Sequence, residues 1–242
     1  MKYRNYYEMI KAVQPDRVAL IEDGRIYTYG DIIRQADVVS DRYKGILAGS
    51  PEKNICTGNS EKNVAAELGS VIILENDICL IVKATVALEL VYFIGIMKAG
   101  KVPVICGGYP DNEELDTIKS IEVPHGAVMG VMTSGTTGSS KALFRTMESW
   151  ADYFPVQNKL FSMGGDTVLF THGSLSFTGN LNLYMGLMHD GGRIVTTRKF
   201  DPRYWAKCID ENYVNYIYLI PVKMMALVKS YSKVGGQDDN IC

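Results

Sequence analysis

The chain has 242 residues, 47% of them hydrophobic, which is enough to bury a sizeable core. Its formal net charge of -2, with no dense block of lysine and arginine, argues against binding to nucleic acid or to an anionic membrane. The five cysteines are widely spaced and include no C-x-x-C pair, which argues against a disulfide framework or a zinc site. We expect small-molecule partners and no resident metal. Because residues 1–13 lack an apolar signal core, we also expect a cytoplasmic protein.

The first predicted elements are a hairpin and a helix. Residues 18–22 and 25–28 flank Asp23-Gly24, a pair typical of a tight turn between two strands. Thr28 is the expected N-cap of the next helix, with Asp31 as the reciprocal acceptor, because apolar residues then recur at helical spacing. These two side chains are therefore predicted to start a helix and to contact no substrate.

An almost wholly apolar window over residues 78–97 is about as long as a membrane span, but it contains Lys83 and Glu89. Each charge would cost ~2.5–3.5 kcal/mol at the centre of a bilayer. We therefore predict a buried strand over residues 78–82 and a buried helix over about 85–98, and no membrane crossing.

Strands and helices are predicted to alternate along the rest of the chain. Strands are expected at 71–74, 101–105, 129–132, 142–146, 166–171, 192–197 and 213–219, and helices at 111–120, 147–161, 181–188, 202–211 and 223–231. Pro155 should end or kink its helix, and Lys101 is expected to be a solvated turn residue. The alternation predicts an α/β fold with a layered, largely parallel sheet flanked by helices.

A run of hydroxyl residues and glycines ending in a lysine follows the apolar stretch 127–132. Its residues are Thr133, Ser134, Gly135, Thr136, Thr137, Gly138, Ser139, Ser140 and Lys141. Glycines let backbone N–H groups turn inward, hydroxyls add donors and the ammonium adds charge, a combination that binds polyphosphate. It is not a Walker A loop, because Ser140 precedes Lys141 and Ala142 follows it. The extended flanks predict a loop between two strands; by composition alone, a flexible turn without a ligand fits equally well.

Three motifs in the same order resemble the adenylate-forming (AMP-binding) superfamily of acyl- and aryl-CoA synthetases, peptide-synthetase adenylation domains and luciferases. The loop at 133–141 resembles the superfamily's Thr-Ser-Gly-Ser/Thr-Thr-Gly run and its lysine, although Ser140 and Ala142 replace the usual proline and glycine. Upstream, residues 27–32 and 97–104 are similar to its Thr-Tyr-x-Glu-Leu and Lys-Ala-Gly-x-x-Pro-Val motifs. The resemblance continues downstream and covers nearly the whole chain.

The resemblance implies that residues 1–242 are the N-terminal part of the large domain of an acyl-CoA synthetase, with candidate lobes at 1–130 and 131–242 and without the small C-terminal domain. It implies an enzyme, an ATP-dependent ligase that converts a carboxylic acid to an acyl-adenylate and pyrophosphate. Transfer of the acyl group to coenzyme A, or to the phosphopantetheine thiol of an acyl carrier protein, commonly follows in the superfamily.

The resemblance also assigns site residues. Those that would hold the β- and γ-phosphates of ATP, with Mg²⁺, are Thr133, Ser134, Gly135, Thr136, Thr137, Gly138 and Lys141. His172 would border the carboxylate and the α-phosphate, as a catalytic and substrate-binding residue, and Gly173 and Asn180 would line the acyl pocket. From the sequence alone, a packing role for His172 is an equally good interpretation.

The sequence lacks the superfamily's adenine-binding loop, its ribose-binding aspartate and its C-terminal catalytic lysine. Because affinity depends on many simultaneous contacts, the chain alone is predicted to be weakly active or inactive, and a complementary C-terminal chain is an expected partner. Two alternatives stay open: a non-catalytic relative that binds a nucleotide or an acyl chain, and an unrelated ATP-dependent phosphotransferase.

Overall fold

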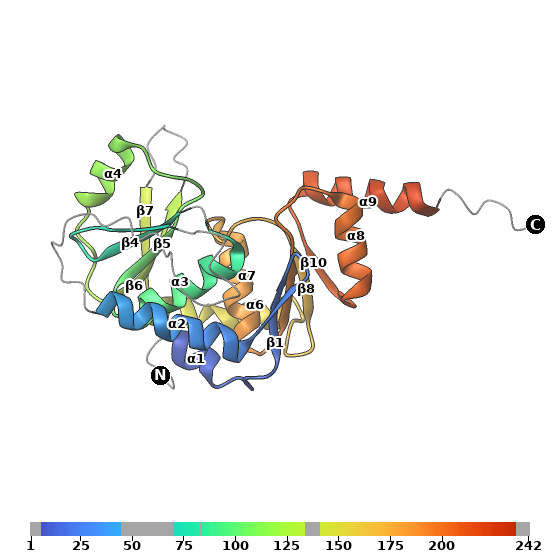
Figure 1. Cartoon of the computed structure of the whole chain (residues 1–242), viewed down its shortest axis with the longest axis horizontal. Helices are drawn as coiled ribbons and strands as arrows, with labels where there is room; N and C mark the ends of the chain where they lie inside the picture. Colours follow the sequence, from blue (N-terminus) through green and yellow to red (C-terminus); the bar gives the residue numbers. More distant parts are fainter. Residues whose placement is uncertain (1–5, 45–69, 83, 134–140, 236–242) are drawn as a thin grey trace, which may run out of the picture.

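The structure, a computed structural model, describes residues 6–44, 70–82, 84–133 and 141–235 (Figure 1). The described strands form two five-stranded sheets. Sheet A, in the order β10-β8-β9-β1-β2, consists of β1 (Val18–Glu22), β2 (Arg25–Thr28), β8 (Val168–Thr171), β9 (Arg193–Thr196) and β10 (Tyr216–Tyr218). Sheet B, in the order β3-β4-β5-β6-β7, consists of β3 (Ser70–Ile73), β4 (Ile78–Val82), β5 (Val102–Ile105), β6 (Ala127–Thr133) and β7 (Lys141–Thr146).

Parallel strands occupy the centre of both sheets. In sheet A, β10, β8, β9 and β1 are parallel and β2 is antiparallel to β1. In sheet B, β4, β5 and β6 are parallel, and β3 and β7 are antiparallel. The predicted α/β class with largely parallel strands is therefore confirmed, with the strands divided between two sheets. The division into lobes at residue 130 stays a prediction; β6 spans that position, and the first two strands share a sheet with the last three.

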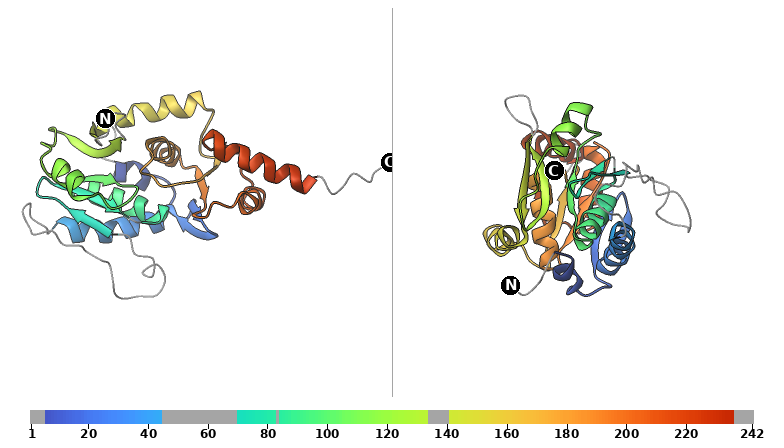
Figure 2. Two further views of the ribbon diagram at one scale, coloured as in Figure 1. Left: turned by 90° about the horizontal axis from the view of Figure 1, so that it is seen from above. Right: turned by 90° about the vertical axis from the view of Figure 1, so that its left-hand side faces the viewer.

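The helices cover these sheets. They are α1 (Tyr6–Lys11), α2 (Tyr29–Lys44), α3 (Val86–Lys98), α4 (Asn112–Lys119), α5 (Met147–Ala151), α6 (Tyr153–Leu160), α7 (Thr178–His189), α8 (Pro202–Glu211) and α9 (Pro221–Gly235). Helices α2 and α6 lie on opposite sides of the molecule, whereas α8 and α9 lie together at one end (Figure 2).

Alternate residues of the strands of sheet A point to opposite faces, as the pleat requires. Leu20, Leu169 and Ile194 join the main core, whereas their neighbours Ile21, Phe170 and Val195 join a second cluster with residues of α8 and α9. Both faces of the sheet are thus buried at the central strands β1, β8 and β9, which explains why these strands are largely apolar runs without polar alternation.

The predicted helix start at Thr28 is confirmed. The Asp31 N–H donates to Thr28 Oγ1 at 3.1 Å, and Asp31 Oδ2 accepts from the Thr28 N–H at 2.9 Å. This reciprocal pair satisfies backbone donors that the first turn of α2 would otherwise leave unpaired.

The apolar window is a buried strand and a buried helix, as predicted. All five residues of β4 are buried, and α3 is buried along almost its whole length. Thr85 caps α3 by accepting from the Leu88 N–H, and Gly100 follows the helix with a φ of +82°. None of the helices that the structure describes is long and apolar enough to cross a membrane.

Two local predictions need correction. Lys101 is not solvated: its side chain is buried, and Nζ lies 2.7 Å from Asp77 Oδ1 in the turn between β3 and β4, so the ion pair compensates the burial of the charge. The break expected at Pro155 occurs instead at Asp152, between α5 and α6. Pro155 lies in the first turn of α6, where a missing N–H costs nothing.

Gly95 allows α2 and α3 to pack closely, because a Cβ at this position would lie 2.6 Å from Val39 Cβ and 2.7 Å from the Ala36 carbonyl oxygen. Gly95→Ala should therefore lower the free energy of unfolding by about 1–3 kcal/mol, measured by urea denaturation. The matched control is Gly108→Ala, where a Cβ would meet nothing within 4 Å; it should change stability by less than about 0.5 kcal/mol. Equal losses in the two variants would contradict the close packing.

Candidate functional site

The carboxyl ends of the parallel strands in the two sheets face each other, and two buried carboxylates join them. Glu22, the last residue of β1, accepts from the backbone N–H of Val86 at 2.9 Å, at the start of the helix that follows β4. Glu89, one turn further along α3, accepts from Ser174 Oγ at 2.6 Å and from the Leu175 N–H at 2.7 Å, in the loop after β8. Ligands of open α/β sheets bind at such carboxyl edges.

The predicted phosphate loop leaves sheet B at this same edge. Thr133 ends β6 and Lys141 begins β7, and they are register partners across the antiparallel pair, so the prediction that the loop joins two strands is confirmed. The loop residues Ser134, Gly135, Thr136, Thr137 and Gly138 lie outside the described residues. Beside β6, the chain leaving β5 approaches the other sheet: a Cβ on Gly107 would lie 3.4 Å from Ser176 Oγ.

His172, Gly173 and Asn180, which the resemblance assigns to the acid, line one cavity of about 230 Å³. His172 and Gly173 follow the carboxyl end of β8, and Asn180 lies in the first turn of α7. The other lining residues are the polar Ser174, Ser176 and Lys223 and the more apolar Phe177, Tyr218, Leu219 and Ile220. The cavity therefore combines an apolar wall with a few convergent polar groups, as small-molecule sites do.

The ring of His172 packs against aromatic neighbours. Its centroid lies 4.6 Å from that of Trp205, and Phe200 contacts it edge-on. Both ring nitrogens are buried, and neither has a hydrogen-bond partner among the described residues. Burial, and then the ammonium of Lys223, lower the pKa of His172 below its ordinary value, so the ring is neutral at pH 7. The ring of His172 therefore packs in an aromatic cluster beside the cavity, with both of its nitrogens buried.

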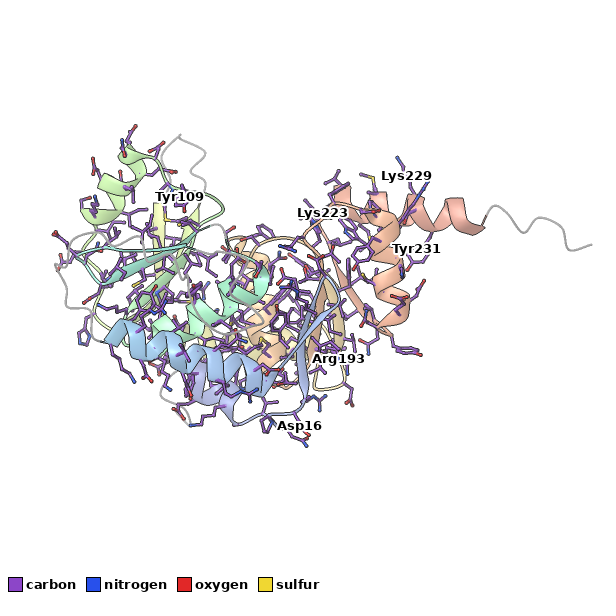
Figure 3. All side chains as sticks on the ribbon, viewed as in Figure 1. Asp16, Tyr109, Arg193, Lys223, Lys229 and Tyr231 are labelled. Atoms are coloured by element: carbon purple, nitrogen blue, oxygen red, sulfur yellow. The ribbon has the colours of Figure 1, made fainter. Side chains whose placement is uncertain are left out.

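The backbone of the His172 loop is held from two sides. Gly173 has a φ of +126°, and a Cβ there would lie 3.3 Å from Asn180 Nδ2 and 3.4 Å from Lys223 Nζ. Asn180 Nδ2 donates to the Ser174 carbonyl at 3.2 Å, and Lys223 Nζ donates to the His172 carbonyl at 3.0 Å. Figure 3 shows Lys223 at the start of α9, where this helix meets the body of the molecule. Asn180 therefore fixes the loop as well as lining the cavity.

Sequence reasoning missed four residues of this region. Lys223 lies two residues after Pro221, the first residue of α9. Ser174 and Ser176 lie between the predicted site residues Gly173 and Asn180, and this position in the sequence was an available signal. Glu89 is the single charged residue among the apolar positions of α3 before Lys98, and a charge that survives in a buried helix indicates a partner.

The comparisons with known proteins agree with the motifs. No family model matches the sequence. YhfT of Bacillus subtilis, an uncharacterised acyl-CoA ligase, is 25% identical over 60% of this chain and 31% of its own length. VraA of Staphylococcus epidermidis, whose proposed activity is that of a long chain fatty acid-CoA ligase, is 22% identical over 89% of this chain and 47% of its own length. The chain thus spans about a third to a half of these relatives.

The fold matches solved structures of the same kind. MenE of Bacillus subtilis, an o-succinylbenzoate coenzyme A synthetase solved in complex with AMP, superposes with a TM-score of 0.67 at 14% identity, over 93% of this chain and 64% of that chain. The resemblance to the adenylate-forming superfamily is confirmed. The fold is that of the N-terminal portion of an adenylate-forming large domain, and the sequence is similar to acyl-CoA ligases.

The lowered pKa of His172 gives a test of its environment. The ring-proton NMR resonance of His172, assigned with His172→Gln, should titrate with a midpoint below 6.5. Because the folded state then holds fewer protons than the unfolded one, the wild type should lose stability relative to His172→Gln as the pH falls below 6.5. Lys223→Met should raise the midpoint by removing the neighbouring charge, whereas Lys207→Met, on the exposed face of α8, should leave it unchanged. A wild-type midpoint at or above 6.5 would contradict this environment.

Proposed function

We propose that this chain supplies the phosphate loop and the acid pocket of an ATP-dependent adenylate-forming ligase. The enzyme would activate a carboxylic acid as an acyl-adenylate and then pass the acyl group to coenzyme A or to a carrier thiol. The observation that carries the proposal is the meeting of the two carboxyl edges: the strand pair at Thr133 and Lys141 leads into the loop on one edge, and the cavity at His172 lies on the other. The cytoplasm, where ATP is available, is the proposed location.

The donor set of the loop fits phosphate oxygens. Backbone N–H groups at its glycines, the hydroxyls of its threonines and serines and the ammonium of Lys141 would hold the β- and γ-phosphates. When the carboxylate attacks the α-phosphorus, a C–O–P linkage forms and negative charge grows on the departing pyrophosphate, which these donors would stabilise. Mg²⁺ would arrive with ATP and neutralise the same charge; within the described residues, no group of acidic, histidine or cysteine side chains could hold a metal ion by itself.

The acid side of the site would be the cavity after β8. Its apolar wall would suit an acyl group, the ammonium of Lys223 would attract the carboxylate, and His172 would border it. Gly173 and Asn180 would line the pocket and keep the loop in place. This division puts the two substrates on opposite sheets, with the reacting atoms between them.

The whole reaction requires more contacts than this chain provides. The chain spans less than two thirds of the relatives it matches, and its sequence contains no adenine- or ribose-binding pattern. Affinity for a nucleotide depends on many contacts made together. We therefore expect weak activity or none from the chain alone, with a complementary C-terminal chain or segment, and an acyl carrier protein, as proposed partners.

The decisive experiment is carboxylate-dependent exchange of labelled pyrophosphate into ATP across a panel of fatty, aryl and amino acids. This chain is compared with a version extended through any adjoining reading frame. Exchange by the extended protein alone would support the proposal. Exchange by neither would favour a non-catalytic relative that binds a nucleotide or an acyl chain, and rapid exchange by the short chain would contradict its predicted incompleteness.

Lys141→Ala in the active form should lower the exchange rate by about 10²–10³-fold, the usual effect of removing one transition-state donor. The fold should survive, because Lys141 begins an edge strand of sheet B. The matched control is Lys207→Ala, an exposed lysine of α8 whose partner is Glu211; it should retain the wild-type rate. An unchanged rate in Lys141→Ala would remove the loop lysine from the mechanism.

A further inference from the structure

A short chain of hydrogen bonds runs from the buried centre of α3 to the cavity. Ser174 Oγ lies 2.6 Å from Glu89 Oε1 and 2.9 Å from Ser176 Oγ, and Ser176 lines the cavity. The second carboxylate oxygen of Glu89 accepts from the Leu175 N–H at 2.7 Å. Glu89 itself is only 3% exposed, so its carboxyl group has almost no direct contact with solvent.

The Ser174 hydroxyl has one proton and two oxygen partners, so it donates to only one of them at a time. When Glu89 is ionised, its oxygens only accept, so Ser174 donates to Glu89 and Ser176 donates to Ser174. When Glu89 carries a proton, its O–H donates to Ser174, and Ser174 donates in turn to Ser176. The Ser176 N–H, which donates to Ser174 Oγ at 3.0 Å, is satisfied in both arrangements.

These two arrangements present different groups to the cavity. With Glu89 ionised, the Ser176 proton is used within the loop, and only lone pairs of its oxygen face a ligand. With Glu89 protonated, the Ser176 hydroxyl is free to donate. A carboxylate accepts hydrogen bonds and cannot donate them, so it is bound better in the second arrangement.

We propose that Glu89 is a positioning residue that acts through Ser174 to set whether Ser176 offers a proton or a lone pair, so that carboxylate binding in the cavity is coupled to uptake of one solvent proton by Glu89. The choice of a carboxylate as ligand rests on the proposed function. The relay itself rests on the three side chains and their distances alone.

The surroundings of Glu89 bring its pKa close to neutral pH. Burial raises the pKa of Glu89 to about 7, although the hydrogen bonds from Ser174 and Leu175 oppose this shift. Glu22 of β1 acts in the same direction through its negative charge. Tyr184 of α7 also faces this pair, but burial raises the pKa of its hydroxyl, which therefore stays neutral.

Two titratable groups lie at the cavity end of the relay. Burial lowers the pKa of His172 below its ordinary value of 6.5, which places it below the pKa of about 7 of Glu89. Lys223 also has a lowered pKa, again because of burial. Loss of the Lys223 charge would also weaken carboxylate binding at high pH. The binding experiment therefore includes the variant Lys223→Met, in which the dependence of Kd on pH that Glu89 causes must remain.

The relay is tested first without a ligand. The backbone amide resonances of Leu175 and Ser176 are followed by NMR from pH 6 to 9, and both should shift with one midpoint near 7. Glu89→Gln should abolish this transition. The matched control Glu22→Gln, the other buried carboxylate, should keep the transition at a somewhat lower pH, because a neighbouring negative charge is lost. A Ser176 amide that does not titrate with Leu175, or a transition that persists in Glu89→Gln, would overturn the proposal.

The coupling is tested with octanoate and benzoate as probes. The Kd of the wild type should rise by up to about tenfold for each pH unit above the midpoint. Glu89→Gln should bind with the same Kd from pH 6.5 to 8.5, because its amide N–H donates to Ser174 permanently and holds the relay in the donating arrangement. Ser176→Ala should bind several-fold more weakly than the wild type at pH 6.5 and should lose the slope.

The outcomes separate the coupling from the proposed function. Binding of a probe with the same Kd at pH 6.5 and 8.5 in the wild type would overturn the coupling and leave the acid pocket intact. Failure of both probes to bind at pH 6.5 would count against the acid pocket and against the coupling to a carboxylate, while the amide titration would still decide whether Glu89 controls Ser176.

Discussion

The geometry of the site depends on two carboxylates that are buried between the sheets. An unpaired buried charge costs several kcal/mol, so Glu22 and Glu89 are tolerated only because donors from the opposite sheet's loops meet them. Glu22 receives two N–H groups from the first turn of α3, where the helix dipole also favours negative charge. Glu89 receives one hydroxyl and one N–H from the loop after β8. Polar contacts of this kind are directional, so they fix the distance and the angle between the two carboxyl edges, which apolar packing alone would leave looser.

Much of the secondary structure followed from local signals. The hairpin at Asp23-Gly24, the capping pair at Thr28 and the helix over residues 202–211 have the bounds that turn chemistry and helical spacing predicted. The order of the strands in the sheets could not be predicted from local signals, because β1 pairs with β9, more than one hundred and seventy residues later in the chain. The prediction for Lys101 was wrong for the same reason: its partner, Asp77, is close in space, but no spacing in the sequence marks the pair.

The candidate site divides in the same way. The loop at 133–141 and His172 were named from motifs, and the motifs describe chemistry that is contiguous in sequence. Glu89 and Ser174 are 85 positions apart, and their hydrogen bond exists only once α3 and the loop after β8 have packed together. Sequence reasoning noticed Glu89 only as an obstacle to a membrane span. The same charge is better understood as a sign that a buried helix has a polar partner.

The end of sheet A offers a surface on which further polypeptide could complete the proposed site. Strand β10 lies at the edge of the sheet, all three of its residues are half-buried, and α9 projects from the body of the molecule (Figure 1). Helix α9 carries Val222, Met225 and Val228, each more than half exposed. Strands of parallel sheets are normally covered, and contiguous exposed apolar residues mark contacts with other polypeptide. Because Tyr218 of β10 and Lys223 of α9 line the cavity, a segment packed against this end would also close the wall of the acid pocket. A closed wall excludes water and strengthens each polar contact with the ligand, so the pocket and a segment packed against this end would act as one site.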